Sequence, residues 1–448
     1  MKIDPSIFKA YDIRGRVGTE LTPYVAEKIG RAFAAWLPNE GVVAVGRDMR
    51  PDSENLAKAL IKGLTSSGRD VLDIGEVTSD MIYFAVGSQK LAGGVMVTAS
   101  HNPGEYNGIK LCREAAKPIG EETGLLQIRD LSVKEIGTST TGDGSVTSKD
   151  IAKDWVGHVL SFIDATKLKP LKIAVDAGNG MAGKIFPEIE KYLPFTVNEL
   201  FFKLDGTFPN HIANPLEAKN LVDLQAAVKK GHCNAGVAFD GDGDRAVLVD
   251  ENGEPLSGTV LTALLAEYFL KLHPGATILH NAICGRAAIE TIQKNGGKPV
   301  RTRVGHSFIK ADMRTYNAVF AGEHSGHYYF KDNYMADSGL IAAVIGLYIL
   351  SESGKPLSKL VQDFRKSYVQ IPETNFEVQD KETKLQEIAS EFAGNDMDWL
   401  DGLSVRLSDD AWFNIRPSNT EPLLRFNAEA KNKKDLEILT QKVTKLLA

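Results

Sequence analysis

The sequence predicts an α/β protein in which three similar α/β domains, with mixed and largely parallel sheets, and a C-terminal α+β domain surround a central cleft. Three observations favour this fold. Short β-branched runs alternate with amphipathic helical segments up to about residue 366, a pattern typical of parallel sheets. The alternation occurs in three rounds, and each round reaches an apolar strand followed by a polar loop. From about residue 367 the pattern changes to strands, a hairpin and two helices.

The domain boundaries follow from these changes of pattern. A chain of 448 residues has the length of about three domains of ~150 residues, and the fourth expected domain is small. The polar segment 137–150 is the clearest linker. We expect domains at 1–145, 146–250, 251–366 and 367–448. The identity between the three rounds is too weak to be called a sequence repeat.

Each round supplies a small set of expected elements. The first contains strands at 41–48, 70–75 and 93–100 and a helix at 52–68 that begins at Asp52 or Ser53. The second contains strands at 171–180 and 234–241 and a helix at 216–231. The third contains strands at 276–283 and 318–326 and a helix at 286–295. The apolar run 340–350 predicts a buried helix, because it is too short to span a bilayer.

The C-terminal domain has its own pattern. We expect a helix at 381–392, a hairpin that ends near 417, a strand at 423–430 and a final helix with Leu436, Leu439, Val443 and Leu446 on one face. Across the three earlier rounds, the polar loops all follow strands. Ligands bind outside the carboxyl ends of strands in open α/β sheets, so the three loops are expected to converge on one cleft.

Composition excludes several kinds of protein. The net charge of −6 and the absence of a long basic run argue against nucleic acid as a partner. The cysteines, Cys112, Cys233 and Cys284, form no CxxC pair and are interpreted as reduced, which indicates a cytoplasmic protein. No signal peptide is visible and no membrane association is expected. The oligomeric state is not readable from the sequence, and a monomer is expected.

An aspartate-rich loop is the most informative feature of the sequence. Asp240, Asp242 and Asp244, with Glu251, match four positions of a calcium-binding EF-hand loop. However, Arg245 stands where that loop requires glycine, and the flanking segments look like strands. A plain solvated turn is the other alternative. Three carboxylates so close together repel one another without a cation, so we expect a hard divalent ion. The adjacent Arg245 indicates an anionic ligand shared with that metal.

A serine loop lies at the end of the strand expected at 93–100. Pro103 stiffens the turn after Ser100, and a serine in this position is expected to be presented to solvent. His101 and Lys110 are close in sequence and are able to hydrogen-bond a transferring group. An ordinary loop serine fits this segment equally well when it is taken alone. The esterase motif GxSxG is absent around Ser100.

Three further segments have polar or glycine-rich loops. In segment 322–327, an extended backbone would point Glu323, Ser325 and His327 the same way, and a carboxylate with a hydroxyl suits sugar hydroxyls. Segment 416–422 offers a phosphate cradle, and its candidate residues are Arg416, Ser418, Asn419 and Thr420. Each also fits a plain polar loop or turn. Segment 178–185 lacks the Ser or Thr of a P-loop and is interpreted as a strand-to-helix turn.

The loops TASHNP (98–103), DGDGDR (240–245), GEHSGH (322–327) and RPSNTEP (416–422), in this order, resemble those of the α-D-phosphohexomutase superfamily. The closest resemblance is to the bacterial phosphomannomutase/phosphoglucomutase members. It extends from FKAYDIRG (8–15) to the phosphate loop near the C-terminus, and the first three loops together are highly specific. The family has four domains around a cleft, of which the first three share an α/β fold, and the resemblance implies the same arrangement here.

The resemblance also implies roles for individual residues. Ser100 resembles the serine that carries the catalytic phosphoryl group, and its phosphate would be the fourth Mg²⁺ ligand beside Asp240, Asp242 and Asp244. Arg245 would pair with that phosphate, while Lys110 or a cleft histidine would act as acid or base. The remaining implied site residues are His101 near the serine, Glu323 and Ser325 in the sugar loop, Arg416, Ser418, Asn419 and Thr420 in the phosphate loop, and Tyr11, Arg14, His306 and His327 in the cleft lining.

The implied activity is reversible phosphoryl transfer between the 1- and 6-positions of a hexose phosphate, mannose and/or glucose, through a phosphoserine and a 1,6-bisphosphate. Mg²⁺ is the implied cofactor, and glucose 1,6-bisphosphate or mannose 1,6-bisphosphate the implied activator. His324 favours these sugars, because related glucosamine mutases usually carry glutamine there. Ile283 stands where many relatives have a substrate-contacting lysine, and Arg286 is a candidate to replace it. The alternatives are a phosphoglucosamine mutase, a metal-dependent sugar phosphatase and a calcium-binding protein.

Overall fold

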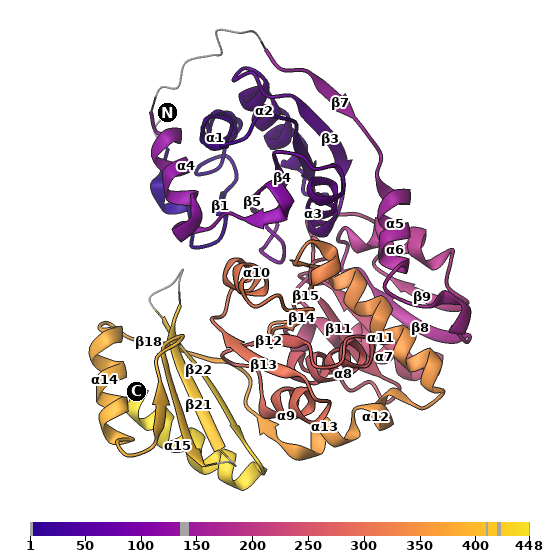
Figure 1. Cartoon of the computed structure of the whole chain (residues 1–448), viewed down its shortest axis with the longest axis vertical. Helices are drawn as coiled ribbons and strands as arrows, with labels where there is room; N and C mark the ends of the chain where they lie inside the picture. Colours follow the sequence, from indigo (N-terminus) through magenta and orange to yellow (C-terminus); the bar gives the residue numbers. More distant parts are fainter. Residues whose placement is uncertain (1–2, 135–142, 409–410, 419–422, 448) are drawn as a thin grey trace. The chain divides into compact units, whose positions relative to one another are not determined.

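The structure is a computed structural model that describes residues 3–134, 143–408, 411–418 and 423–447. Figure 1 shows its helices and strands with their labels. The chain divides into two compact units. The first unit comprises residues 1–256 and 325–358, and the second comprises residues 257–324 and 359–448. Within the described residues, no helix is both long enough and apolar enough to cross a membrane.

The first sheet of the first unit has the strand order β1-β5-β4-β2-β3-β7, with β6 beside β5. Its strands are β1 (Ile13–Arg16), β2 (Val43–Arg47), β3 (Val71–Glu76), β4 (Gly93–Val97), β5 (Tyr106–Arg113), β6 (Lys117–Pro118) and β7 (Val146–Ser148). The helices are α1 (Pro23–Trp36), α2 (Ser53–Thr65), α3 (Ser79–Ser88) and α4 (Leu125–Ser132). Strands β4, β2, β3 and β7 run parallel, whereas β5 is antiparallel to both β4 and β1. The β4–β5 connection therefore returns along the same sheet and carries the Ser100 loop.

The second sheet has the order β11-β10-β8-β9. Its strands are β8 (Leu171–Asp176), β9 (Phe195–Leu200), β10 (Ala235–Phe239) and β11 (Ala246–Asp250), and its helices are α5 (Ala152–Leu160), α6 (Ala182–Glu190) and α7 (Val222–Gly231). Strands β10, β8 and β9 are parallel, and β11 is antiparallel to β10. The aspartate loop connects β10 to β11. The unit also contains β15 (Tyr328–Phe330), β16 (Ala336–Asp337) and the buried helix α11 (Gly339–Ser353), which confirms the helix expected at 340–350.

The second unit begins with α8 (Gly258–Leu272), whose N-terminus is capped by Ser257: the Ser257 Oγ accepts a hydrogen bond from the backbone N–H of Val260. Parallel strands β12 (Thr277–Asn281), β13 (Lys298–Thr302) and β14 (Phe320–Gly322) follow, together with helices α9 (Arg286–Lys294), α10 (His306–Thr315) and α13 (Gln362–Ser367). The short helix α12 (Leu357–Leu360) lies at the boundary of the two units.

An antiparallel sheet with two helices completes the second unit. Its strands are β17 (Val369–Gln370), β18 (Thr374–Glu377), β19 (Asp396–Asp398), β20 (Leu403–Ser408), β21 (Ala411–Pro417) and β22 (Leu423–Ala430). The helices are α14 (Lys381–Glu391) and α15 (Lys433–Leu447). Helix α15 buries Leu436, Leu439, Val443 and Leu447, whereas the expected Leu446 is only partly buried. The predicted fold class, largely parallel α/β sheets followed by an α+β region, is confirmed.

Candidate active site

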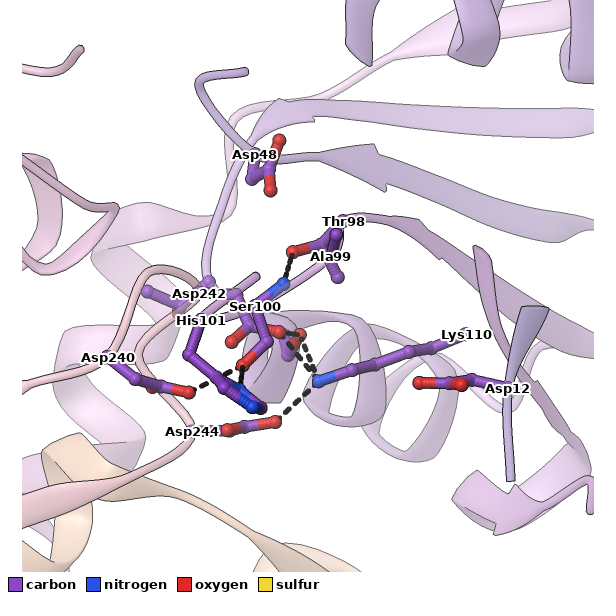
Figure 2. Close-up of polar contacts among 12 residues, drawn as sticks. Asp12, Asp48, Thr98, Ala99, Ser100, His101, Lys110, Asp240, Asp242 and Asp244 are labelled. Carbon is purple, nitrogen blue, oxygen red and sulfur yellow. Dashed lines mark hydrogen bonds and ion pairs between the residues drawn. The ribbon is translucent and has the colours of Figure 1, made fainter. Parts of the chain in front are cut away.

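Ser100 occupies a strained position at the end of β4. Its backbone is in the left-handed region with φ of 51°, which costs a residue other than glycine about 1–3 kcal/mol. The backbone N–H of Ser100 donates to Thr98 Oγ1 at 2.9 Å, and its Oγ donates to Asp240 Oδ2 at 2.7 Å (Figure 2). The same Oγ lies 3.1 Å from His101 Nδ1. The strain aims the hydroxyl at the aspartate loop of the second sheet.

The expectation that Ser100 is presented to solvent is wrong, because only 1% of its surface is exposed. The β10–β11 loop packs directly against it: a Cβ atom on Gly241 would clash with the Ser100 carbonyl oxygen. A sequence pattern read within one domain does not show that a loop from another domain covers the serine. A buried serine beside buried carboxylates suits chemistry from which water is excluded.

The three aspartates form a compact cluster of carboxylates. Asp240, Asp242 and Asp244 are buried, and each offers a carboxylate oxygen within 4.8 Å of those of the other two. The Oδ1 of Asp242 has no hydrogen-bond partner in the part of the chain that the structure describes. Buried carboxylates with an unused oxygen fit a hard divalent cation such as Mg²⁺. Glu251 lies beyond β11, where it accepts hydrogen bonds from Ser358, so the EF-hand match is a coincidence of spacing.

The pKa values of the three aspartates are shifted in different directions. Burial and the neighbouring carboxylates raise the pKa of Asp240 well above its usual value. Burial also acts to raise the pKa of Asp242 and Asp244, but the pKa of each is lowered, because Lys110 and Ser79 together outweigh it at Asp242, and Lys110, His327 and Arg245 together outweigh it at Asp244. The cation of Lys110 therefore balances negative charge on Asp242 and Asp244.

Lys110, on β5, is bound to two of the aspartates. Its Nζ lies 2.6 Å from Asp242 Oδ2 and 2.6 Å from Asp244 Oδ2 (Figure 2). Burial alone would lower the pKa of Lys110, but the two carboxylates outweigh burial and raise it. In this arrangement Lys110 is a cation and a proton donor.

Arg245 connects the aspartate loop to two histidines. Its backbone N–H donates to Asp240 Oδ1 at 3.1 Å, its Nη2 donates to His101 Nδ1 at 2.9 Å, and its Nε donates to His327 Nε2 at 3.2 Å. Burial, followed by the charges of Arg245 and Arg14, lowers the pKa of His101 well below its usual value, so His101 is neutral at neutral pH. Arg245 and His101 thus lie beside Ser100 as a fixed cation and a neutral imidazole.

Four other expected residues lie in the same unit. Arg14, on β1, donates from Nε to Asp12 Oδ2 at 2.9 Å and from Nη1 to the Ala99 carbonyl at 2.9 Å. His327 accepts from Arg245, as described above, and its Nδ1 lies 3.2 Å from Ser325 Oγ. Tyr11 precedes β1 and is partly exposed. The first unit thereby collects Ser100, His101, Lys110, the three aspartates, Arg245, Arg14, Ser325 and His327.

The remaining expected residues belong to the second unit. Glu323 is 2% exposed and accepts hydrogen bonds from Asn281 Nδ2 at 3.1 Å and from the Gly305 backbone N–H at 3.4 Å. His306 begins α10 and is partly exposed. Residues 324 and 325 form a turn, so the extended backbone assumed for 322–327 is absent.

Arg416 and Ser418 lie at the end of β21. Arg416 Nη2 donates to Glu373 Oε2 at 2.9 Å, and Arg425 donates to Glu373 Oε1 at 2.9 Å and to Ser418 Oγ at 3.3 Å. Glu373 therefore holds the arginines of this loop in place. The predicted phosphate-binding residues Asn419 and Thr420 lie outside the described residues.

The three residues that bear on sugar choice, Ile283, Arg286 and His324, also lie in the second unit. Ile283 is buried. Arg286 lies beside Glu290 at 3.4 Å and over the ring of Tyr368, so its guanidinium is engaged within α9 and by the α13–β17 connection. His324 is partly exposed, and its Nδ1 lies 3.0 Å from Thr259 Oγ1.

The sequence patterns gave no role to several residues that organise the site. Arg50 and Asp48 follow β2, and Ser79 begins α3. Ser79 Oγ donates to Asp242 Oδ2 at 2.5 Å, and the Ser79 backbone N–H donates to the Asp242 carbonyl at 3.0 Å. The only signal in the sequence was that polar residues follow the strands at 43–47 and 71–76.

Comparison with known proteins shows the family to which the chain belongs. Models of the phosphoglucomutase/phosphomannomutase family match in order: alpha/beta/alpha domain I at residues 5–135, domain II at 153–253, domain III at 257–368 and the C-terminal domain at 373–446. The chain belongs to this family, the phosphohexomutases, which are isomerases of the mutase type and depend on a metal.

Similar proteins cover nearly the whole chain. The phosphohexose mutases of Xanthomonas campestris pv. campestris are 42% identical over 447 residues, which are 98% of each chain. The phosphomannomutase of Vibrio cholerae is 39% identical, covering 98% of this chain and 97% of its own. The crystal structure of a phosphoglucomutase/phosphomannomutase family protein from Burkholderia thailandensis has a TM-score of 0.91 at 35% identity, covering 99% of this chain and 97% of that one.

Proposed function

We propose that this protein interconverts the 1-phosphates and 6-phosphates of mannose and/or glucose through a phosphorylated Ser100 and a 1,6-bisphosphate. The observation that carries the proposal is the position of the Ser100 hydroxyl, 2.7 Å from Asp240 and 3.1 Å from His101, in a water-poor site with Arg245 and Lys110 close by. Phosphoryl transfer depends mainly on positioning and on neutralising charge, and this site offers both.

In the proposed reaction, each P–O bond that breaks is matched by a P–O bond that forms. The P–O bond to Ser100 Oγ breaks as a P–O bond to the free sugar hydroxyl forms, and the hydroxyl proton passes to a basic group. The bisphosphate then turns around, and its other phosphoryl group returns to Ser100. Arg245 is placed to neutralise charge on the group that moves.

Asp240, Asp242 and Asp244 would hold Mg²⁺ together with the phosphate on Ser100. When bound, Mg²⁺ would neutralise negative charge on the transferring group. Lys110 is protonated in the present arrangement and is the candidate for the general acid that gives a proton back to the departing oxygen. His101, which is neutral and lies 3.1 Å from Ser100 Oγ, is a candidate to accept the proton of the sugar hydroxyl.

In this proposal, residues of the second unit bind the substrate. Arg416, held by Glu373, and Ser418 would bind the phosphate that is not reacting, and Glu323 would bind sugar hydroxyls. Mannose and glucose phosphates are favoured over glucosamine phosphate because His324 stands where glucosamine mutases usually carry glutamine. A bisphosphate activator follows from the need to load Ser100. The three cysteines are free and buried, which supports a cytoplasmic setting.

The test supplies mannose 1-phosphate, glucose 1-phosphate or glucosamine 1-phosphate with Mg²⁺ and a trace of glucose 1,6-bisphosphate, and follows products by ³¹P NMR. A mutase forms the 6-phosphate, whereas a phosphatase releases inorganic phosphate. Ser100→Ala should abolish mutase turnover while Mg²⁺ binding and the fold are retained. Full turnover by this variant would exclude Ser100 as the phosphoryl carrier.

A further inference from the structure

Arg50 makes more hydrogen bonds to the Ser100 loop than any residue considered above. It lies between β2 and α2 and is 3% exposed. Its Nη1 donates to the carbonyls of Pro103 and Tyr106, both at 2.8 Å, and its Nη2 donates to the carbonyls of Ser100 at 2.9 Å and Asn102 at 2.6 Å. One planar group thus holds three carbonyls of the loop between β4 and β5 and the carbonyl of Tyr106, the first residue of β5.

The fifth N–H of the guanidinium also has an acceptor. Arg50 Nε donates to Asp48 Oδ2 at 3.2 Å, so all five guanidinium donors are used. Asp48 is itself fixed, because its Oδ1 accepts from the Arg50 backbone N–H at 3.0 Å and from Ser53 Oγ at 2.5 Å. Asn107 on β5 donates to Ser53 Oγ at 2.9 Å. The arginine is therefore anchored to the same sheet whose loop it holds.

The second α/β domain covers the flat face of this group. The guanidinium carbon of Arg50 lies 5.1 Å from the centre of the Phe208 ring. The turn before Phe208 is equally close: a Cβ atom on Gly206 would lie 2.5 Å from Arg50 Cα, and one on Gly104 would lie 2.9 Å from the Gly206 carbonyl oxygen. Arg50 is thereby fixed from both sides, by Asp48 in its own domain and by Phe208 in the next.

Ser100 needs such support because its backbone is held in an unfavourable region. A residue with φ of 51° keeps that conformation only where its surroundings impose it. The backbone N–H of Ser100 is held by Thr98, and its carbonyl oxygen is held by Arg50. A displacement of about 1 Å in a reacting group can lower a rate about 100-fold, so the loop position matters for transfer to and from Ser100.

We propose that Arg50 is a positioning residue for phosphoryl transfer, which sets the conformation of the Ser100 loop without touching the substrate. The inference rests on the proposed function. Lysine cannot replace arginine here, because its three donors radiate from a single nitrogen and cannot span four carbonyls in one plane.

Arg69 provides a matched control in the same domain. It donates to the carbonyls of Ala34 from Nε at 3.2 Å and from Nη2 at 3.0 Å, to Asn39 at 2.5 Å and to Leu37 at 3.0 Å, and none of these residues belongs to the site. Arg69→Lys and Arg50→Lys therefore remove similar hydrogen bonds in different places. We expect Arg50→Lys to lower kcat about 100-fold with KM changed less than 3-fold, and Arg69→Lys to leave kcat within 2-fold.

Hydrogen exchange of the backbone amides tests the same inference without activity. Arg50→Lys should speed exchange at least 10-fold in residues 98–106, whereas Arg69→Lys should change exchange only near residues 34–39. Phe208→Leu, a milder variant, should lower kcat about 5-fold and speed exchange in 98–106, so an unstable Arg50→Lys protein does not prevent the test. Unchanged exchange in 98–106 for both Arg50→Lys and Phe208→Leu would overturn the role of Arg50.

The two proposals fail in different ways. A wild-type protein that forms no 6-phosphate from any of the three 1-phosphates contradicts the proposed function, and the exchange data still decide whether Arg50 holds the loop. An active wild type, with an Arg50→Lys variant that loses no more kcat than Arg69→Lys, contradicts the role of Arg50 and leaves the mutase assignment standing.

Discussion

Lys110 Nζ lies 2.6 Å from Asp242 Oδ2, so a cationic side chain is bound to a carboxylate that is also an expected Mg²⁺ ligand. Lys110 contacts Asp244 Oδ2 at the same distance. A bound Mg²⁺ would therefore compete with the lysine for the charge of the same carboxylates. Asp242 Oδ1 remains without a hydrogen bond in the described part of the chain, which leaves one oxygen for the metal.

Lys110→Met should increase Mg²⁺ affinity about 10-fold at pH 8 and lower kcat at least 100-fold. A 10-fold higher affinity is a gain of about 1.4 kcal/mol in the binding free energy of Mg²⁺. This is smaller than the repulsion of ~4 kcal/mol between two like unit charges 4 Å apart near a protein surface, which removal of the lysine charge relieves. The loss of kcat corresponds to the usual contribution of a general acid or base. Calorimetric titration measures the affinity, and Lys58→Met, at an exposed lysine paired with Glu54, is the control. Weaker Mg²⁺ binding in Lys110→Met would contradict the competition.

Ser79→Ala should weaken Mg²⁺ binding about 10- to 100-fold, the usual cost of losing a group that orients a metal ligand. The Ser79 Oγ donates to Asp242 Oδ2 at 2.5 Å, so its removal leaves Lys110 as the remaining side-chain donor to that oxygen and loosens the carboxylate. Ser88 on the same helix donates only to the Phe84 carbonyl, which makes Ser88→Ala a matched control. Equal Mg²⁺ affinities in the two variants would show that Ser79 does not orient Asp242.

The fold was predictable because its signals are local. The alternation of strands and helices, and the spacing of Asp240, Asp242 and Asp244, are visible within short segments. The burial of Ser100 was not predictable in this way, because it depends on Gly241 from another domain. Arg50 and Ser79 were missed for the same reason: their partners are 50 to 56 and 163 residues away, respectively.

Glu373→Gln should destabilise the C-terminal sheet by about 1–3 kcal/mol at pH 7, because it leaves Arg416 and Arg425 without their carboxylate partner. Burial acts to raise the pKa of Glu373, but Arg416, Asn427 and Arg425 outweigh it and the pKa is lowered. The stabilisation is therefore complete above the usual glutamate pKa and is lost as pH falls through the lowered value.

The difference between wild type and Glu373→Gln should accordingly shrink as the pH falls below the usual glutamate pKa of about 4.3. Hydrogen exchange of the β21 and β22 amides, compared between variants at each pH, measures it. Glu377→Gln, at an exposed position on the adjacent β18, is the control. A difference that does not change with pH would show that the charge of Glu373 is not the source of the stabilisation.

Gly241→Ala tests whether close contact between the Ser100 loop and the aspartate loop is required. A Cβ atom at this position would clash with the Ser100 carbonyl oxygen, and the backbone of Gly241 is otherwise compatible with alanine because its φ is not positive. The expected result is a loss of kcat of at least 100-fold, since the two loops must separate.

Gly157→Ala on α5 is the control, because its Cβ atom would meet open space and alanine favours a helix by about 0.5–1 kcal/mol. We expect Gly157→Ala to keep wild-type kcat and to unfold at the same or a slightly higher temperature. If Gly241→Ala also keeps wild-type kcat, transfer at Ser100 does not need this contact.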